Sequence, residues 1–179
     1  VFFNVGTFPQ ISIDNSQTIT VNPTCFGDTN GSITVQATGG TGLSYRYSWT
    51  NLNNNTNQAT NLGAGGYEVV IMDSNNCTTR DTLFVTQPDP LVASVDRIRT
   101  VELDCNNQDQ GKIVLSTIGG NPGLKAYTWE SGVTADRETA SNLSAGTYCA
   151  TVSDNKGCMD TICYTLVAPA PLVGRLNPT

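Results

Sequence analysis

The sequence predicts an all-β protein built from two tandem immunoglobulin-like β-sandwich repeats, each stapled by disulfide bonds. Three observations support this prediction: a composition rich in turn residues, a pattern that recurs along the chain, and six cysteines without any histidine. Only 13% of the 179 residues are charged, and glycine is abundant at 17. This balance, with many Thr and Asn residues, favours short strands joined by tight turns over helices.

The recurrence is an internal repeat. Sliding the sequence against itself by 80 residues aligns Cys25 with Cys105 and Trp49 with Trp129, and a single inserted residue then moves the offset to 81. The aligned residues belong to rare types or to turns, which makes coincidence untenable as an explanation. The further aligned pairs are Gly39/Gly119, Leu62/Leu143, Tyr67/Tyr148, Asp73/Asp154 and Cys77/Cys158.

The repeat sets the expected domain boundaries. We expect residues 1–10 to be the exit of a preceding repeat, 11–90 and 91–171 to be the two sandwiches, and 172–179 to begin a following repeat or a linker. The junctions at 87–90 and 168–171 each contain two prolines. Proline fixes φ and favours extended backbone, so these junctions are expected to act as semi-rigid spacers.

Each repeat is expected to be all-β. Residues 32–37 alternate polar and apolar side chains, as a half-buried strand does. Further strands are expected at 44–50, 66–72 and 78–86, and in the second copy at 112–117, 126–129, 147–153 and 159–166. Five to seven short strands with a buried tryptophan on a middle strand fit an immunoglobulin-like sandwich.

The cysteines are expected to form three disulfides, which places the protein in an oxidising compartment. If every connection reverses the chain direction, the strands that begin near Gly31 and Cys77 start at the same end of the sandwich. That arrangement pairs Cys25 with Cys77. The second copy would pair Cys105 with Cys158, and its extra cysteines, Cys149 and Cys163, would face each other across one hairpin. Other pairings of six cysteines remain open.

Composition excludes several classes of function. A net charge of −6 and a pI near 4.4 oppose nucleic-acid binding, which needs basic patches. No apolar run approaches about 18 residues, so we expect no direct membrane insertion. The absence of histidine removes the usual base for a Ser or Cys nucleophile, and no C-x-x-C pair supports zinc. We therefore expect no enzyme activity, no catalytic residue, no cofactor and no metal.

Two groups of residues have both a functional and a structural interpretation. The segments 28–31 and 73–76 have the oxygen-rich character of calcium loops, but Asx-turns explain them equally well and are preferred. Tyr45, Tyr47 and Trp49 resemble an aromatic platform for sugars. Because Trp49 and Tyr47 recur as Trp129 and Tyr127, core packing is the preferred interpretation.

A set of turn, aromatic and cysteine residues forms a recognisable motif in the first copy. Its residues are Cys25, Asp28, Asn30, Gly31, Ser32, Ile33, Gly39, Gly40, Tyr45, Tyr47, Ser48, Trp49, Leu62, Ala64, Gly65, Gly66, Tyr67, Asp73, Asn75, Asn76, Cys77, Gln87 and Pro88. This pattern resembles the SprB repeat of gliding bacteria in the Bacteroidota. The second copy departs from it at 106–110 and by its extra cysteine pair.

The resemblance implies a structural or adhesive segment of a long adhesin at the cell surface, exported by type IX secretion and linked to gliding or attachment. Its expected partners are neighbouring repeats and, beyond them, surface polysaccharide or other cell-surface proteins. Two alternatives stay open: a discrete carbohydrate- or protein-binding module, and a subunit of a self-assembling filament.

Bacteria of this group attach O-linked sugars at Asp-Ser/Thr followed by an aliphatic residue. Thr82 and Thr161 both fit that pattern, because each follows an aspartate and precedes Leu83 or Ile162. Both are therefore candidate O-glycosylation sites.

Overall fold

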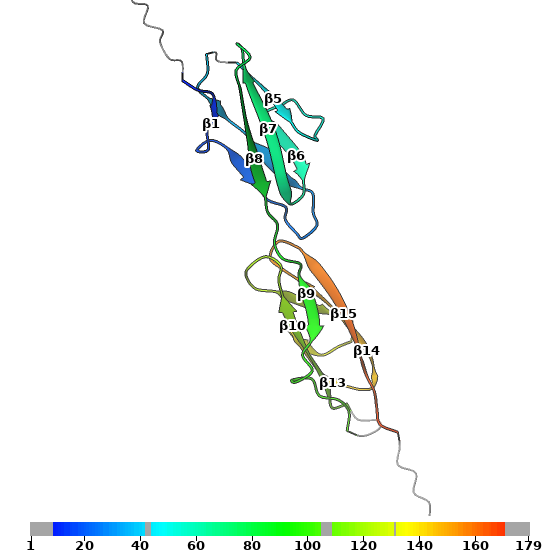
Figure 1. Cartoon of the computed structure of the whole chain (residues 1–179). Helices are drawn as coiled ribbons and strands as arrows, with labels where there is room; N and C mark the ends of the chain where they lie inside the picture. Colours follow the sequence, from blue (N-terminus) through cyan, green and yellow to red (C-terminus); the bar gives the residue numbers. More distant parts are fainter. Residues whose placement is uncertain (1–8, 42–43, 105–108, 131, 171–179) are drawn as a thin grey trace, which may run out of the picture. The chain divides into compact units, whose positions relative to one another are not determined.

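The computed structural model describes residues 9–41, 44–104, 109–130 and 132–170. The chain divides into two compact units, residues 1–88 and 89–179 (Figure 1). All regular elements in the described residues are β-strands, which confirms the predicted all-β class. Among these residues there is no helix long and apolar enough to cross a membrane.

Unit 1 is a sandwich of short sheets. One sheet has the strand order β2-β3-β6, another has β5-β7-β8, and β1 pairs with β4 in a two-stranded ribbon. The longest strands, β7 and β8, form one hairpin that runs the length of the unit (Figure 1). The bounds are β1 Ser12–Ile13, β2 Ile19–Val21, β3 Gly31–Thr34, β4 Ala37–Thr38, β5 Tyr45–Trp49, β6 Gln58–Leu62, β7 Gly65–Asp73 and β8 Thr78–Val85.

Unit 2 repeats this plan with a longer first sheet. Its strand orders are β12-β13-β10-β9 and β11-β14-β15, and β14 and β15 form the long hairpin. The bounds are β9 Val92–Val95, β10 Gly111–Ile118, β11 Ala126–Trp129, β12 Ala135–Asp136, β13 Thr139–Leu143, β14 Gly146–Ser153 and β15 Met159–Leu166.

Each unit has its own hydrophobic core between its sheets. In unit 1, Ile33, Val69 and Ile71 are fully buried, and Trp49 is 2% exposed. In unit 2, Ile113 and Val152 hold the corresponding places. Strand alternation explains this pattern, because every second residue of β7 faces the opposite sheet. The two clusters have no residue in common.

A tyrosine near the start of the long hairpin closes one end of each sandwich. The Tyr67 hydroxyl donates a hydrogen bond to the Gly63 carbonyl at 3.0 Å, and Tyr148 does the same to the Ser144 carbonyl at 3.0 Å. A tyrosine that bonds back to the backbone a few residues upstream is a feature of immunoglobulin-like sandwiches. The predicted fold class is confirmed at this level of detail.

The strands β6 and β13 were not among those expected from the sequence. Each is mostly polar, and each contains a β-bulge. In unit 1, Gly31 pairs with Leu62 and Ser32 with Thr60, so Asn61 is the extra residue, with φ of 58°. The bulge turns both Ala59 and Leu62 toward the core. The bulge of β13 places Asn142 at φ of 57° in the same way.

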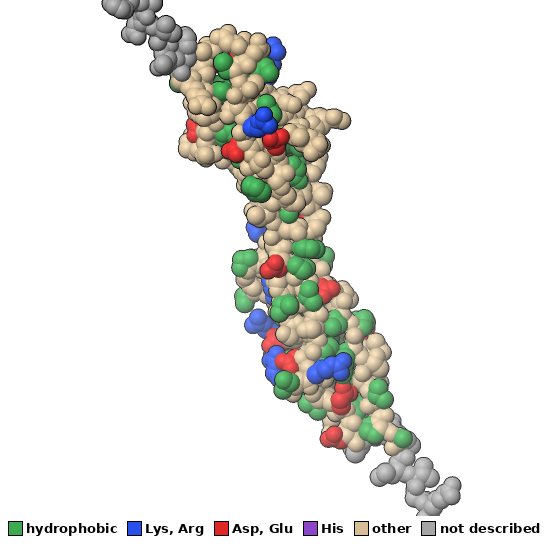
Figure 2. Space-filling model, viewed as in Figure 1, with side chains coloured by type: hydrophobic (Ala, Val, Ile, Leu, Met, Phe, Trp, Pro, Cys, Tyr) green, Lys and Arg blue, Asp and Glu red, His purple; other side chains and the backbone are tan. Residues whose placement is uncertain are grey.

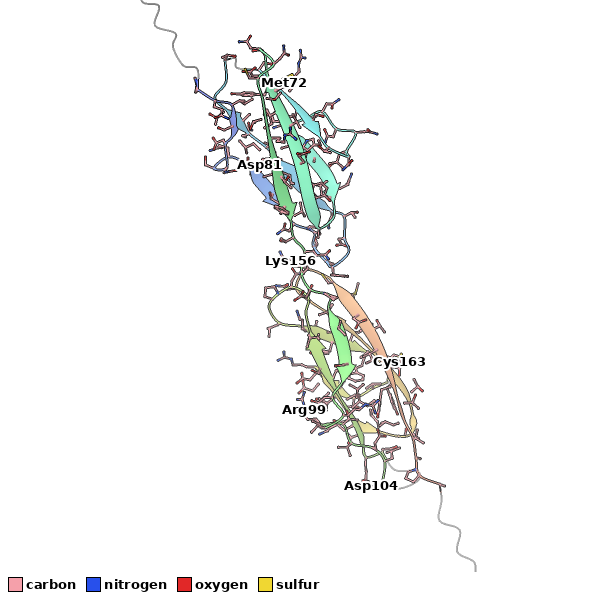
Figure 3. The ribbon with its side chains drawn as sticks, viewed as in Figure 1. Met72, Asp81, Arg99, Asp104, Lys156 and Cys163 are labelled. Atoms are coloured by element: carbon pink, nitrogen blue, oxygen red, sulfur yellow. A yellow bond between two sulfur atoms is a disulfide. The ribbon has the colours of Figure 1, made fainter. Side chains whose placement is uncertain are left out.

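The structure corrects the predicted bridge between Cys25 and Cys77. Cys25 is disulfide-bonded, whereas Cys77 is a free, exposed thiol. Cys77 lies in the turn before β8, at the end of unit 1 where Figure 3 labels Met72. The Cys25 loop lies at the other end, where the Gly27 amide donates to the Gln87 side chain at 2.9 Å.

The distance between these two ends rules out a bond. A strand of 8 residues such as β8 spans about 26 Å, whereas bridged cysteines have their Cα atoms within about 7 Å. The prediction assumed that each connection reverses direction. Instead, residues 50–57 carry the chain back, so that β5 and β6 run the same way: β5 begins opposite Asp73, and β6 begins opposite Thr34.

In unit 2 the structure pairs Cys149 with Cys163, the hairpin pair expected from the sequence. The two residues are direct partners in the register of β14 and β15. Cys158 is also disulfide-bonded. Its expected partner, Cys105, lies outside the described residues.

Candidate functional site

The first candidate, the 73–76 turn, is held by hydrogen bonds to the buried Asp73 carboxylate, an arrangement that we call the aspartate lock. The Asp73 carboxylate is 2% exposed. Its Oδ1 accepts the Asn75 and Cys77 amides at 2.9 Å, and its Oδ2 accepts the Thr41 amide and hydroxyl at 3.0 Å. Gly40, with φ of 77°, makes this approach possible, because an added Cβ would lie 2.9 Å from Oδ2. The turn interpretation therefore fits Asp73 better than a calcium loop.

Asp154 forms the same lock in unit 2. Its Oδ2 accepts the Asn121 amide at 2.7 Å and the Asn121 side chain at 3.0 Å. Its Oδ1 accepts the amides of Lys156 at 2.9 Å and Cys158 at 3.1 Å. Each aspartate thus ties the turn of the long hairpin to the glycine-rich loop that precedes β5 or β11.

These hydrogen bonds lower the pKa of both carboxyl groups. For Asp73, the hydrogen bond from the Thr41 amide is the main cause, and it outweighs burial, which raises the pKa. For Asp154, burial raises the pKa, but the combined hydrogen bonds from Asn121, Lys156 and Cys158 outweigh it. Both groups are held as carboxylates because the donors around them stabilise the charged form.

The 28–31 segment also turns inward on itself. The Asp28 carboxylate accepts the Cys25 amide at 3.0 Å, and the Asn30 side chain bonds the Thr24 amide and hydroxyl at 2.9 Å. Across the described part of the chain, no group of three or more His, Cys, Asp or Glu side chains is placed to hold a metal ion.

The aromatic residues of β5 belong to the core. Trp49 is buried and donates its indole N–H to the Thr56 carbonyl at 2.9 Å. Tyr45 and Tyr47 are half-buried and pack against the same cluster, and the Tyr45 hydroxyl donates to the Gly39 carbonyl at 2.7 Å. Because all three rings pack against the core cluster, the core interpretation fits them better than a platform for sugars.

Both candidate glycosylation threonines lie on the exposed side of the last strand of their unit. Thr82 is exposed on β8, and Thr161 is exposed on β15. In both units the backbone N–H of the threonine donates a hydrogen bond to the carboxylate of the preceding aspartate. The distance is 2.8 Å from Thr82 to Asp81 and 2.9 Å from Thr161 to Asp160. The Thr161 hydroxyl also lies 2.9 Å from that of Thr151. The structure thus gives both hydroxyl groups access to solvent.

One feature of unit 2 was missed from the sequence. An open groove of about 340 Å³ is lined by three basic side chains, Arg99, Lys125 and Arg137, together with Glu138 and several hydroxyl groups. Figure 2 shows more basic side chains on unit 2 than on unit 1. The alignment of the two copies gave one indication of this groove, because Lys125 aligns with the uncharged Tyr45. The three basic side chains come together only in the folded unit.

Comparison with known proteins supports the family resemblance. Residues 17–54 match the family model described as the SprB repeat, which confirms the resemblance predicted from the sequence. The match covers β2 to β5 and includes the Cys25 loop, Gly39, Gly40 and Trp49. It points to a structural repeat module rather than an enzyme. No curated protein matches the chain.

Several solved structures are similar over most of the chain. Domains 4 and 5 of the S-layer protein SbsC share 14% identity at a TM-score of 0.38, with 91% of this chain and 100% of that chain covered. The four N-terminal Ig domains of Dscam1 share 10% sequence identity at a TM-score of 0.37, and the match covers 92% of this chain and 47% of that chain. A C-terminal fragment of intimin, solved with the intimin-binding domain of its translocated receptor, shares 17% sequence identity at a TM-score of 0.33. The match covers 92% of this chain and 64% of that chain. At these TM-scores, none of the three contributes to the functional argument.

Proposed function

We propose, from the SprB-repeat match over residues 17–54, that this chain is a structural repeat segment of a long secreted adhesin at the cell surface. It acts as part of a stalk that extends the adhesin during gliding or attachment. The disulfide between Cys149 and Cys163 supports export, because such bonds persist in oxidising compartments. The proline-containing junctions support a stiff connection between repeats.

The main support for the proposal is the structural role of the residues that both units share. The tryptophans, tyrosines and aspartates that recur in both units build the fold: Trp49 and Trp129 bond a neighbouring loop, Tyr67 and Tyr148 close the corner, and the paired aspartates lock the hairpin turn. Their polar groups are satisfied within their own unit. Selection for a repeated scaffold explains this, whereas a repeated catalytic or binding site would require shared groups that face solvent.

A cell-based experiment tests the stalk. Antibodies raised against the 179-residue chain should label intact cells of the source organism, and removal of these repeats from the gene should shorten the surface fibre seen by electron microscopy. Attachment or gliding should weaken in the same strain. Labelling that requires permeabilised cells, or a fibre of unchanged length, would contradict the proposal.

The O-glycosylation of Thr82 and Thr161 belongs to the same proposal. Their exposure on β8 and β15 leaves room for a sugar outside the core. The intact mass of the chain purified from its own host should exceed the sequence mass, and the excess should fall in T82A and T161A variants. A mass equal to that of the unmodified sequence would remove this part of the proposal.

Self-assembly into a filament is the second candidate, and the edge strand β2 favours it. This strand ends the sheet β2-β3-β6, and its Ile19 and Val21 are 60% and 50% exposed. An apolar edge strand is a template for pairing with another chain. Sedimentation of the purified chain should then depend on concentration, and V21K, which places a charge on the edge, should abolish that dependence.

A further inference from the structure

The groove of unit 2 brings together basic side chains from three separate segments. Arg99 follows β9, Lys125 precedes β11, and Arg137 lies between β12 and β13. Arg99 lies on the side of unit 2 opposite Cys163 (Figure 3). The chain as a whole has a net charge of −6. A cluster of cations on such an acidic chain is a departure from its average surface and calls for a physical cause.

The framework holds each cation in place through its backbone or an adjacent group. The Arg99 Nε donates to the Asp96 carboxylate at 2.6 Å, which leaves the rest of the guanidinium, 55% exposed as a side chain, directed to solvent. Trp129 donates its indole N–H to the Arg137 carbonyl at 2.9 Å. The half-buried Lys125 donates to the Asn121 carbonyl at 2.5 Å, and an ammonium group has further donors to offer an anion.

Unit 1 shows that the fold does not need these charges. In its corresponding turn, which begins at Asp14 as the unit 2 turn begins at Asp96, the third residue after the aspartate is the uncharged Gln17 where unit 2 has Arg99. The counterparts of Lys125 and Arg137 are Tyr45 and Thr56, and the Thr56 carbonyl accepts the Trp49 indole N–H as the Arg137 carbonyl accepts that of Trp129. The same scaffold therefore forms without any of the three cations, and their presence in unit 2 requires another explanation.

The walls of the groove indicate what kind of anion fits. Ser116 and Thr117 of β10 line it, and the Thr117 hydroxyl lies 3.2 Å from that of Tyr127. A volume of about 340 Å³ lies at the lower end of the range of small-ligand sites, about 300–1,000 Å³. Peptides usually anchor in deep apolar pockets or along a free strand edge, and densely acidic peptides dock on clusters of arginines that are free of carboxylate partners. This open groove, with its hydroxyl and cationic walls, matches a sugar chain better than a peptide.

We propose that this groove binds an acidic oligosaccharide of the uronic-acid type, with ring carboxylates against Arg99, Lys125 and Arg137 and sugar hydroxyls against Ser116, Thr117 and Tyr127. Glu138 in the groove and Asp96 beside Arg99 offset part of the positive charge. They favour a ligand whose carboxylates are spaced along a chain over one with dense charge. The proposal goes beyond the stalk role, and its failure would leave that role intact.

The test is a nuclear magnetic resonance titration of the full chain with a hexamer of galacturonic acid. The amide signals of Ser116, Thr117, Lys125 and Glu138 should shift, while unit 1 serves as an internal control whose signals stay fixed. The matched variant is R99Q/K125Y/R137T, which gives unit 2 the residues of unit 1. Its dissociation constant should rise by at least about tenfold, since each screened charge contact contributes a few-fold.

Two further ligands identify the chemistry. The methyl ester of the same hexamer, which lacks charge, should bind at least about tenfold more weakly, and a hexamer of glutamate should not shift the groove signals. The proposal would be overturned if the ester bound as tightly as the acid, or if the triple variant bound the acid as tightly as the parent chain. It would also be overturned if the acid caused no shift at about 10 mM, a weak-affinity limit. Tighter binding of the peptide would assign the groove to acidic proteins instead. If the triple variant unfolds, the single variants R99Q and R137T carry the same test.

Discussion

Asp73 and Asp154 occupy the same place in the two units, at the turn into the last strand of the long hairpin. Each accepts four hydrogen bonds from its own unit, two of them from the loop before β5 or β11. The donors stabilise the carboxylate over the neutral acid. At the residue scale, these groups connect the stability of the fold to pH.

The stability of the chain should fall as the solution is acidified below about pH 4. An aspartate in the unfolded chain has a pKa of about 3.9, and both folded pKa values lie below their usual range. The stabilisation that the two carboxylates give to the folded state is therefore present above about pH 4, and it is lost as the pH falls toward their folded pKa values. Thermal unfolding followed by circular dichroism between pH 2 and 7 measures this loss.

The double variant D73N/D154N should show a shallower fall in this window, because an amide does not titrate. The exposed Asp136 on β12 provides a matched control in D136N, which removes one charge without touching either lock. A parent and a double variant with the same acid slope would contradict the role of the two carboxylates.

Asn61 determines the shape of β6. Its φ of 58° lies in the left-handed region, where glycine and asparagine are tolerated and β-branched residues are not. N61G should change the free energy of unfolding by less than about 0.5 kcal/mol, whereas N61V should lower it by about 1–2 kcal/mol. Urea unfolding measures both. T60V, on the neighbouring exposed position of β6, controls for the change of side chain, and an equal cost for all three variants would contradict the strained backbone.

At the scale of elements, the long hairpins are the most strongly determined parts of the fold. In β14 and β15 the outer face carries a row of paired residues, with Thr147 opposite Thr165, Cys149 opposite Cys163, and Thr151 opposite Thr161. Both threonine pairs have their hydroxyl oxygens within 2.9 Å. Such cross-strand pairs fix the register of a hairpin.

Removal of the disulfide in C149A/C163A should lower the free energy of unfolding by about 2–3 kcal/mol, because a loop of 14 residues gains entropy in the unfolded chain. Hydrogen exchange should show the loss in unit 2. The variant C77A, which removes the free thiol of unit 1, is the control and should leave stability unchanged. A loss of similar size in C77A would indicate that Cys77 is bridged in solution.

At the scale of the whole molecule, each unit forms its own core. Ile33 belongs to one cluster and Ile113 to the other, and both are fully buried. Their strands, β3 and β10, hold the same place in the two units. The chain is thus a repeat in structure as well as in sequence.

I33A should cost about 2–5 kcal/mol by leaving a cavity in unit 1, and I113A should have the same cost in unit 2. Because the two clusters share no residue, amide exchange should accelerate mainly in the unit that carries the substitution. Each variant serves as the control for the other. Equal acceleration in both units for either variant would contradict separate cores.

Patterns along the chain were enough to predict the repeat, the strands of the long hairpins and the inward placement of Trp49. It also indicated the Cys149–Cys163 pair. These features depend on local patterns: strand alternation, turn residues, and a spacing symmetric about one turn. A resemblance carried by turns and aromatic residues was enough to indicate the SprB repeat, whose family model matches residues 17–54.

Features that depend on pairing between distant segments became apparent only in the folded structure. The loop at 50–57 makes β5 and β6 run the same way, which sends Cys25 and Cys77 to opposite ends. The bulge at Asn61 makes a polar segment into a core strand. The groove joins Arg99, Lys125 and Arg137 from three parts of the chain. Strand order in a sandwich is set by non-local packing, so no local pattern along the chain encodes it.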